Sequence, residues 1–201
     1  MKHPLVIAIT GSSGVIYGQR LVQIAIETGI DLHLVVSNSG VQVLKHELGI
    51  NLDPNHFQLS QLLGENCPAP TGQLEFHHIN DFMSPIASGS HQTSGMVICP
   101  CSGATLSSVA HGSSRNLIER AADVHLKEGR PLVLVPREAP LSLIHLDNLR
   151  TAKLAGATIL PASPGFYHDT KHIDDLVNFI VARILDQLGI EHHVTERWGD
   201  S

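Results

Sequence analysis

Two short segments rich in glycine and hydroxyl groups are candidates for binding an anion. The first runs from Thr10 to Gly14 and the second from Ser102 to Thr105. Each follows an apolar run and precedes a helical pattern, so backbone N–H groups and hydroxyls would face one ligand. Neither is a GxGxxG or P-loop motif. One such loop is equally well explained as a capped turn, but two at one sheet edge favour a phosphate or nucleotide.

A third candidate is the pair Arg137-Glu138, which lies between Pro136 and Pro140. An arginine at the carboxyl end of a strand can hold a phosphate through two hydrogen bonds, and a glutamate beside it can move a proton. The alternative is a surface ion pair worth less than about 1 kcal/mol. The flanking prolines stiffen the backbone and favour a functional site.

Arg183 and the fourteen histidines are less decisive. Helical spacing puts Arg183 at the rim of an apolar stripe, where it either snorkels over the core or faces a partly buried anion. The adjacent pairs His77-His78 and His192-His193 point apart on any regular element. Because neither HExxH nor a zinc-type Cys/His spacing occurs, we expect no metal site.

Five short apolar runs, each ending in a polar or Gly/Pro-containing segment, must position these groups. Continuous apolar strands suit a parallel sheet that is buried on both faces, and such sheets bind ligands at their carboxyl edge. Four helical patterns alternate with the runs, which predicts an α/β fold with three layers, Rossmann-like (flavodoxin-like), around a mostly parallel sheet. The predicted strands are 5–9, 32–36, 96–99, 132–135 and 158–160, and the predicted helices are 15–28, 116–128, 141–154 and 173–188.

The domain organisation is simple. Residues 1–189 form one predicted domain, and 190–201 a tail that carries Trp198 and is expected to pack on a neighbouring subunit. The segment 51–94 is interpreted as a long irregular excursion with a short helix near 58–63.

Composition narrows the function. Charged residues are only 16% of the 201, which suggests surface hidden in a homo-oligomer, and the net charge of −6 without a basic stripe disfavours nucleic acid. No apolar run reaches the roughly 18 residues of a membrane span. Three cysteines without a CxxC pair indicate reduced thiols and a cytoplasmic protein.

Together these segments resemble the UbiX-type (Pad-type) flavin prenyltransferases over essentially the whole chain. The most specific stretches are 10–14, 87–90, 96–102, 116–128, 130–140 and 164–168. The resemblance implies a flavin-binding α/β domain that transfers a dimethylallyl group from dimethylallyl phosphate to N5 and C6 of reduced FMN and releases phosphate, without a metal. It also implies a homododecamer with sites at subunit interfaces, and prenylated FMN as a product for a UbiD-type decarboxylase.

The resemblance also implies residue roles. FMN would contact the loops at the sheet edge and Arg137; dimethylallyl phosphate would contact Lys127, Tyr167 and Arg183. The catalytic residues would be Ser13, Glu47, Lys127 and Glu138, and Arg120 and Trp198 would lie at the periphery. The FMN-contacting set is Gly11, Ser12, Ser13, Ser37, Ser102, Gly103, Ala104, Thr105 and Arg137.

Two other functions stay open from the sequence. One is an FMN-dependent decarboxylase of the related cysteine-decarboxylating flavoproteins, although the His and Asn/Met-rich motifs of those enzymes are absent. The other is a non-enzymatic FMN carrier.

Overall fold

A computed structural model describes residues 3–65, 67, 70–166 and 170–195. Its centre is a six-stranded sheet in the order β3-β2-β1-β4-β5-β6 with every pairing parallel, as the sequence predicted. The four inner strands are buried because helices cover both faces. The strands are β1 (Leu5–Ile9), β2 (Leu32–Val36), β3 (Leu74–His77), β4 (Gly95–Cys101), β5 (Leu132–Pro136) and β6 (Thr158–Ile159).

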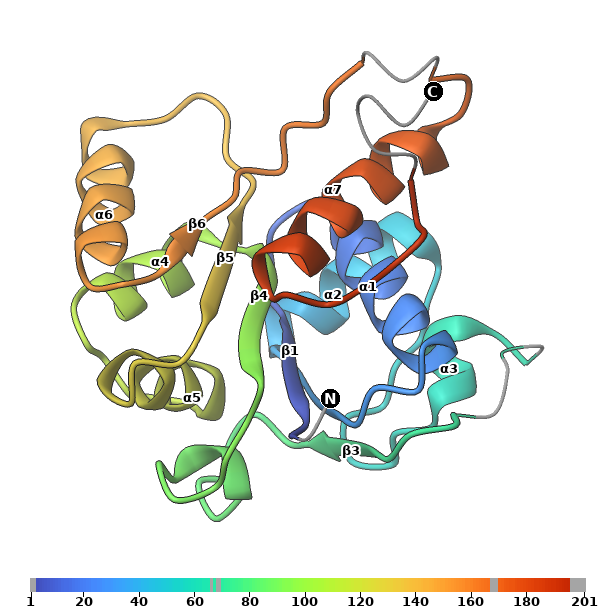
Figure 1. The fold of residues 1–201 in the computed structure, drawn as a ribbon, viewed down its shortest axis with the longest axis horizontal. Helices are drawn as coiled ribbons and strands as arrows, with labels where there is room; N and C mark the ends of the chain where they lie inside the picture. The colour runs from blue at the N-terminus through green and yellow to red at the C-terminus, as the bar shows by residue number, and fades with distance from the viewer. Residues whose placement is uncertain (1–2, 66, 68–69, 167–169, 196–201) are drawn as a thin grey trace.

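Helices pack on the two faces of the sheet as separate layers (Figure 1). One apolar core lies between the sheet and α1, α2, α3 and α7, and the other between the sheet and α4, α5 and α6. The three-layer prediction is therefore confirmed. The helices are α1 (Val15–Glu27), α2 (Asn38–Leu48), α3 (Leu59–Leu63), the short 3-10 helix η1 (Pro85–Ala87), α4 (Gly103–Ala110), α5 (Leu117–Lys127), α6 (Leu143–Leu154) and α7 (Ile173–Gln187).

The predicted ranges missed α2, β3, α4 and the 3-10 helix η1, and they shortened strand β4. Residues 38–48 form α2, because Ser37 accepts a hydrogen bond from the Gly40 N–H and starts a helix in what resembled a flexible loop. The excursion 51–94 contains the predicted short helix but also edge strand β3, whose alternating pattern is too brief to stand out. Strand β4 continues through Pro100 to Cys101, two residues beyond the predicted end.

The predicted tail is only partly described. Ile190 and His192 are buried in this chain, and His192 Nε2 lies 3.2 Å from Asp186 Oδ1. Trp198 lies outside the described residues, so the division at residue 189 and the packing of the tail on a neighbour stay predictions.

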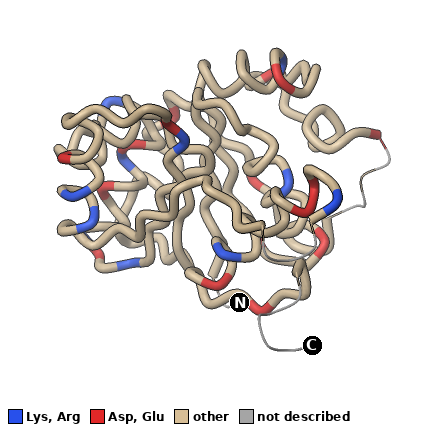
Figure 2. The backbone as a smooth tube through the Cα atoms, turned by 90° about the horizontal axis from the view of Figure 1, so that it is seen from above, with Lys and Arg blue, Asp and Glu red and all other residues tan. Residues whose placement is uncertain are grey.

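The distribution of charged residues and the lengths of the helices can be compared with the expectations from composition. Lys and Arg are interspersed with Asp and Glu along the described chain in the view of Figure 2. Among the described residues, no helix combines the length and apolar character that crossing a membrane requires.

Candidate active site at the carboxyl edge of the sheet

The loops that follow β1 and β4 are joined by the buried hydroxyl of Thr10. Its Oγ1 donates to the Pro100 carbonyl at 2.7 Å and accepts from the Ser102 N–H at 2.8 Å. This happens because β1 and β4 are neighbours and end at the same edge. The two candidate segments of the sequence therefore lie side by side.

The loop that follows β5 joins the same group. Ser12 Oγ donates to the Arg137 carbonyl at 2.7 Å, and Arg137 Nε donates to the Ser13 carbonyl at 3.0 Å. These residues are 124 and 125 positions apart, so only the strand order brings them together. The structure thus positions the Arg137 guanidinium beside the first loop.

The start of α1 is closed by a carboxylate from α2. Glu47 Oε2 accepts from the Gly14 N–H at 2.9 Å and from the Val15 N–H at 3.2 Å. The interpretation of this helix start as open to a ligand phosphate is therefore corrected: these N–H groups face Glu47, an anion of the protein itself.

The charge state of Glu47 follows from these contacts. Partial burial would raise its pKa, but hydrogen bonds from Ser13, Gly14 and Val15, with Arg137 nearby, lower the pKa of Glu47 below its ordinary value. Glu47 is consequently ionised at neutral pH, in contact with the Ser13 hydroxyl.

The starts of α2 and α4 are different. Ser37 and Ser102 cap them by accepting from the Gly40 and Thr105 N–H groups, at 3.0 and 3.3 Å, and no acidic residue lies in either first turn. Ser102 Oγ is also 3.0 Å from Thr105 Oγ1. Both starts keep the positive end of the helix dipole at the sheet edge without a carboxylate of their own first turn.

Glu138 and His145 lie over the start of α4. A Cβ built on Gly103 would be 3.8 Å from Glu138 Oε2 and 3.3 Å from His145 Nε2. Ala104 and Glu138 are exposed, and Gly103 and Thr105 are half-buried, so this corner is open to a small molecule.

His145 is a residue that the sequence analysis missed. Its Nδ1 lies 3.2 Å from the Ser142 N–H and 3.1 Å from Ser142 Oγ at the start of α6, which orients the ring. The spacing of Ser142 and His145 fits a capping box, which is a sequence signal for the start of a helix. That signal does not predict that His145 lies next to Gly103.

Lys127 does not join this group within one chain. It is the last residue of α5, which leads to the amino end of β5, and its Nζ pairs with Glu128 close to Gly89. Helix α5 covers one face of the sheet. Lys127 therefore lies at the opposite edge from Arg137.

Arg183 lies on the other face of the sheet, on α7. Its Nη1 pairs with Asp186 Oδ2 at 2.7 Å, and its side chain is half-exposed at 51%. It lines a cavity of about 310 Å³ with Phe179 and the β6 strand. Lys127 and Arg183 of the same chain are thus separated by the sheet.

Three predicted residues remain, of which the structure describes only Arg120. Arg120 donates from Nε to the Ala87 carbonyl at 3.0 Å and from Nη1 to Asp123 Oδ2 at 2.8 Å, so it braces the segment after β3. Tyr167 and Trp198 lie outside the described residues. Cys99 and Cys101 are buried and unpaired, as packing residues would be.

A larger cavity lies elsewhere. Its volume is about 600 Å³, and it lies against β3 beside Phe57 and Phe76, whose rings stack 4.3 Å apart. Its lining includes none of the predicted site residues, so it is no candidate for their ligand.

Comparison with known proteins identifies the family of the chain. The Flavoprotein family model matches residues 1–185. A curated relative from Halalkalibacterium halodurans, "Flavin prenyltransferase UbiX", is 50% identical over 194 residues, covering 96% of this chain and 92% of the relative.

Two solved structures have the same fold at close similarity. AnUbiX (PadA1), in complex with FMN and dimethylallyl pyrophosphate, has a TM-score of 0.86 at 35% identity, with 100% of both chains covered. A dodecameric FMN-dependent UbiX-like decarboxylase from Escherichia coli O157:H7 has a TM-score of 0.84 at 37% identity, covering 97% of this chain and 98% of that one. The chain therefore belongs to the flavoprotein family and, within it, to the UbiX-type flavin prenyltransferases.

Proposed function

We propose that this protein transfers a dimethylallyl group from dimethylallyl phosphate to N5 and C6 of reduced FMN and releases phosphate. The observation that carries the proposal is the hydrogen-bonded cluster of the β1, β4 and β5 loops, which gathers Ser12, Ser13, Ser102 and Arg137 at one edge. Relatives at up to 50% identity over nearly the whole chain carry the name of this activity.

The carboxyl edge suits FMN. The start of α4, with Ser102, Gly103, Ala104 and Thr105, carries a positive dipole end and hydroxyls without an acidic first turn, and Arg137 lies beside the neighbouring β1 loop. We assign the phosphate to this corner and to Ser37, since Glu47 already occupies the start of α1. Gly11, Ser12 and Ser13 would line the ring. Reduced FMN supplies the two nucleophilic atoms, N5 and C6.

Glu138 is assigned the proton transfer. It is an exposed carboxylate next to the start of α4, so it can accept a proton from a bound ligand and pass it to solvent. The Ser13 hydroxyl donates its one proton to Glu47, which stays ionised, so Ser13 can accept a hydrogen bond from the ring without moving.

Lys127, Tyr167 and Arg183 are assigned to the phosphate of the allylic donor, whose departure they would stabilise with positive charge and hydrogen bonds. Lys127 and Arg183 lie on opposite faces of the sheet in one chain. We therefore infer that neighbouring subunits complete each site, in a homododecamer like the Escherichia coli relative.

Apolar surface on α6 supports such an assembly. Leu143, Ile144 and Leu154 are 71–73% exposed in the single chain. Burying these apolar side chains against a neighbouring subunit would be favourable. We further propose that the reaction needs no metal, that it takes place in the cytoplasm, and that a UbiD-type decarboxylase receives the prenylated FMN.

The test is anaerobic turnover of reduced FMN with dimethylallyl phosphate, followed by mass spectrometry of the flavin and a phosphate assay. We expect a flavin mass increased by one dimethylallyl unit and an equal amount of free phosphate. Unmodified FMN with either the monophosphate or the diphosphate donor would overturn the proposal. Oxidative decarboxylation of a cysteinyl peptide would favour the decarboxylase instead, and FMN binding without either activity would favour a carrier.

A further inference from the structure

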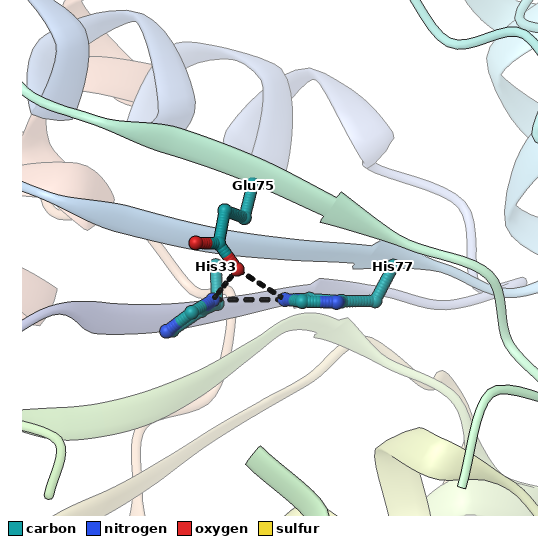
Figure 3. Close-up of side chains that lie close together, drawn as sticks. All are labelled: His33, Glu75 and His77. Carbon is teal, nitrogen blue, oxygen red and sulfur yellow. Dashed lines mark hydrogen bonds and ion pairs between the residues drawn. The ribbon is translucent and has the colours of Figure 1, made fainter. Parts of the chain in front are cut away.

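Three polar side chains converge on one face of the sheet at its β2–β3 edge (Figure 3). Parallel pairing puts His33 on β2 opposite Glu75 on β3, and Val35 opposite His77. Since side chains alternate along a strand, His33, Glu75 and His77 all point to the face that α5 and the segment 78–94 cover. His33 and His77 are 4% and 7% exposed, so both rings are more deeply buried than is usual for histidine.

The distances match a face of a metal coordination sphere. His33 Nδ1 lies 2.8 Å from His77 Nε2, and Glu75 Oε2 lies 3.5 Å from the first nitrogen and 3.8 Å from the second. Ligand atoms about 2.0–2.1 Å from a tetrahedral zinc ion are separated by about 3.3 Å. The three atoms thus need shifts of only a few tenths of an ångström to share one ion.

The outward ring nitrogens are also held. His33 Nε2 lies 3.0 Å from His91 Nε2, and His77 Nδ1 lies 3.0 Å from Ser84 Oγ. Histidines that bind metals almost always donate their second ring N–H to an acceptor, commonly a carboxylate, a backbone carbonyl or water, which sets the tautomer and directs the other nitrogen at the ion. Here those partners leave Nδ1 of His33 and Nε2 of His77 to meet Glu75.

The protonation state suits a ligand set. Burial, helped by the neighbouring His77 and His91 rings, lowers the pKa of His33 to about 4, and burial lowers the pKa of His77 as well. Both rings are therefore neutral at physiological pH, the form that coordinates metal. The Glu75 side chain is 55% exposed, so an ion can enter from solvent along it.

We propose that His33 Nδ1, His77 Nε2 and Glu75 Oε2 bind one divalent transition-metal ion of the zinc class, with water as a fourth ligand. The ion would join β3 to β2 and, through His91 and Ser84, fasten the segment 78–94 over the sheet. None of its ligands belongs to the loops at the carboxyl edge, so the proposed site is structural and separate from the proposed prenyl transfer.

The alternative is a metal-free chain of neutral rings, in which His77 Nε2–H donates to His33 Nδ1 and His33 Nε2–H donates to His91. Such a chain satisfies the nitrogens but gives the Glu75 carboxylate no cation. The two arrangements therefore differ in their response to Glu75 and to added metal.

The test uses the full-length, untagged protein, stripped with a chelator and dialysed. Zn²⁺ is added in stoichiometric amounts, and bound metal and melting temperature are measured; Co²⁺ serves as a spectroscopic probe of ligand geometry. We expect one tightly bound ion per chain, a higher melting temperature, and the intense visible absorption of four-coordinate Co²⁺. Glu75→Gln, at an exposed position that leaves the His–His contact in place, should weaken binding at least tenfold.

Matched controls separate this site from adventitious surface binding by the many other histidines. Glu27→Gln and His56→Asn change exposed residues elsewhere and should bind Zn²⁺ as the unmodified protein does. A second disabling variant, His77→Asn, should lose the Co²⁺ spectrum. The proposal is overturned if Zn²⁺ leaves the melting temperature of the unmodified protein unchanged, or if Glu75→Gln and His77→Asn retain its affinity.

Discussion

The carboxyl edge of the sheet and the histidine cluster at β2–β3 are both polar, but they are built in opposite ways. At the carboxyl edge, side chains extend from loops and helix starts, and hydrogen bonds with backbone groups position them, as Ser12 and Arg137 show. In the cluster, the buried side chains of His33 on β2 and His77 on β3 position each other. Groups at the edge can meet and release a ligand, whereas groups in the cluster can only hold one.

The largest expected effect is a loss of turnover when a residue of the carboxyl edge is changed. Glu138→Gln removes the proposed proton acceptor, so turnover should fall by about 10²- to 10⁴-fold while FMN stays bound. Turnover and FMN affinity are measured together, and Glu27→Gln is the control. If the rate of Glu138→Gln matches that of the control, Glu138 takes no part in the reaction.

A mixing experiment tests the inference that residues of neighbouring subunits complete each active site at the carboxyl edge. Lys127→Ala and Arg137→Ala should each abolish most activity. When the two variants are dissociated and reassembled together, about a quarter of the sites should combine an intact Lys127 from one subunit with an intact Arg137 from another. No recovery in a correctly assembled mixture would mean that both residues must come from the same chain.

Acid titration should reveal protonation of the cluster in a pH window that it shares with the buried His125, whose pKa burial also lowers to about 4. The pKa of His33 is about 4 when folded and 6.5 when unfolded. The unfolded chain therefore takes up protons that the folded chain does not, and stability is complete above pH 6.5 and lost as the pH falls toward 4. Each such histidine lowers the folding equilibrium constant by up to about tenfold per pH unit.

Urea unfolding in the presence of a chelator measures this loss. His33→Asn should reduce the pH dependence without abolishing it, because the pKa values of His77 and His125 are also lowered, and His56→Asn, which changes an exposed residue, should leave it unchanged. An equal slope in all three proteins would show that His33 is protonated as readily in the folded chain as in the unfolded one.

The smallest effect concerns Glu47 and lies in a lower pH window. Its folded pKa is below 4.5, so its contribution is present above that pH and is lost as the pH falls through the folded pKa. Glu47→Gln should cost about 0.5–1 kcal/mol of unfolding free energy at neutral pH, because it removes a charge from the start of α1. The difference from the unmodified protein should vanish in acid; a difference that persists there would assign the loss to packing.

Local patterns were sufficient for much of the fold. The apolar runs at 5–9 and 32–36 coincide with β1 and β2, and the periodic segment 173–188 with α7, because burial imposes a repeat that can be read along the chain. The same runs located the edge where polar loops gather. The sequence patterns did not predict α2, because it starts in a Ser-Asn-Ser-Gly segment, or β3, because it has only four residues.

The chain order of residue types was enough to predict a parallel sheet with a polar carboxyl edge, since strand burial and helix periodicity are local properties. Long-range pairing settled the rest. The carboxylate that closes α1 comes from 33 residues away, and the contact between His33 and His77 spans 44 residues. Such contacts depend on which strands and helices become neighbours, and no spacing along the chain records that.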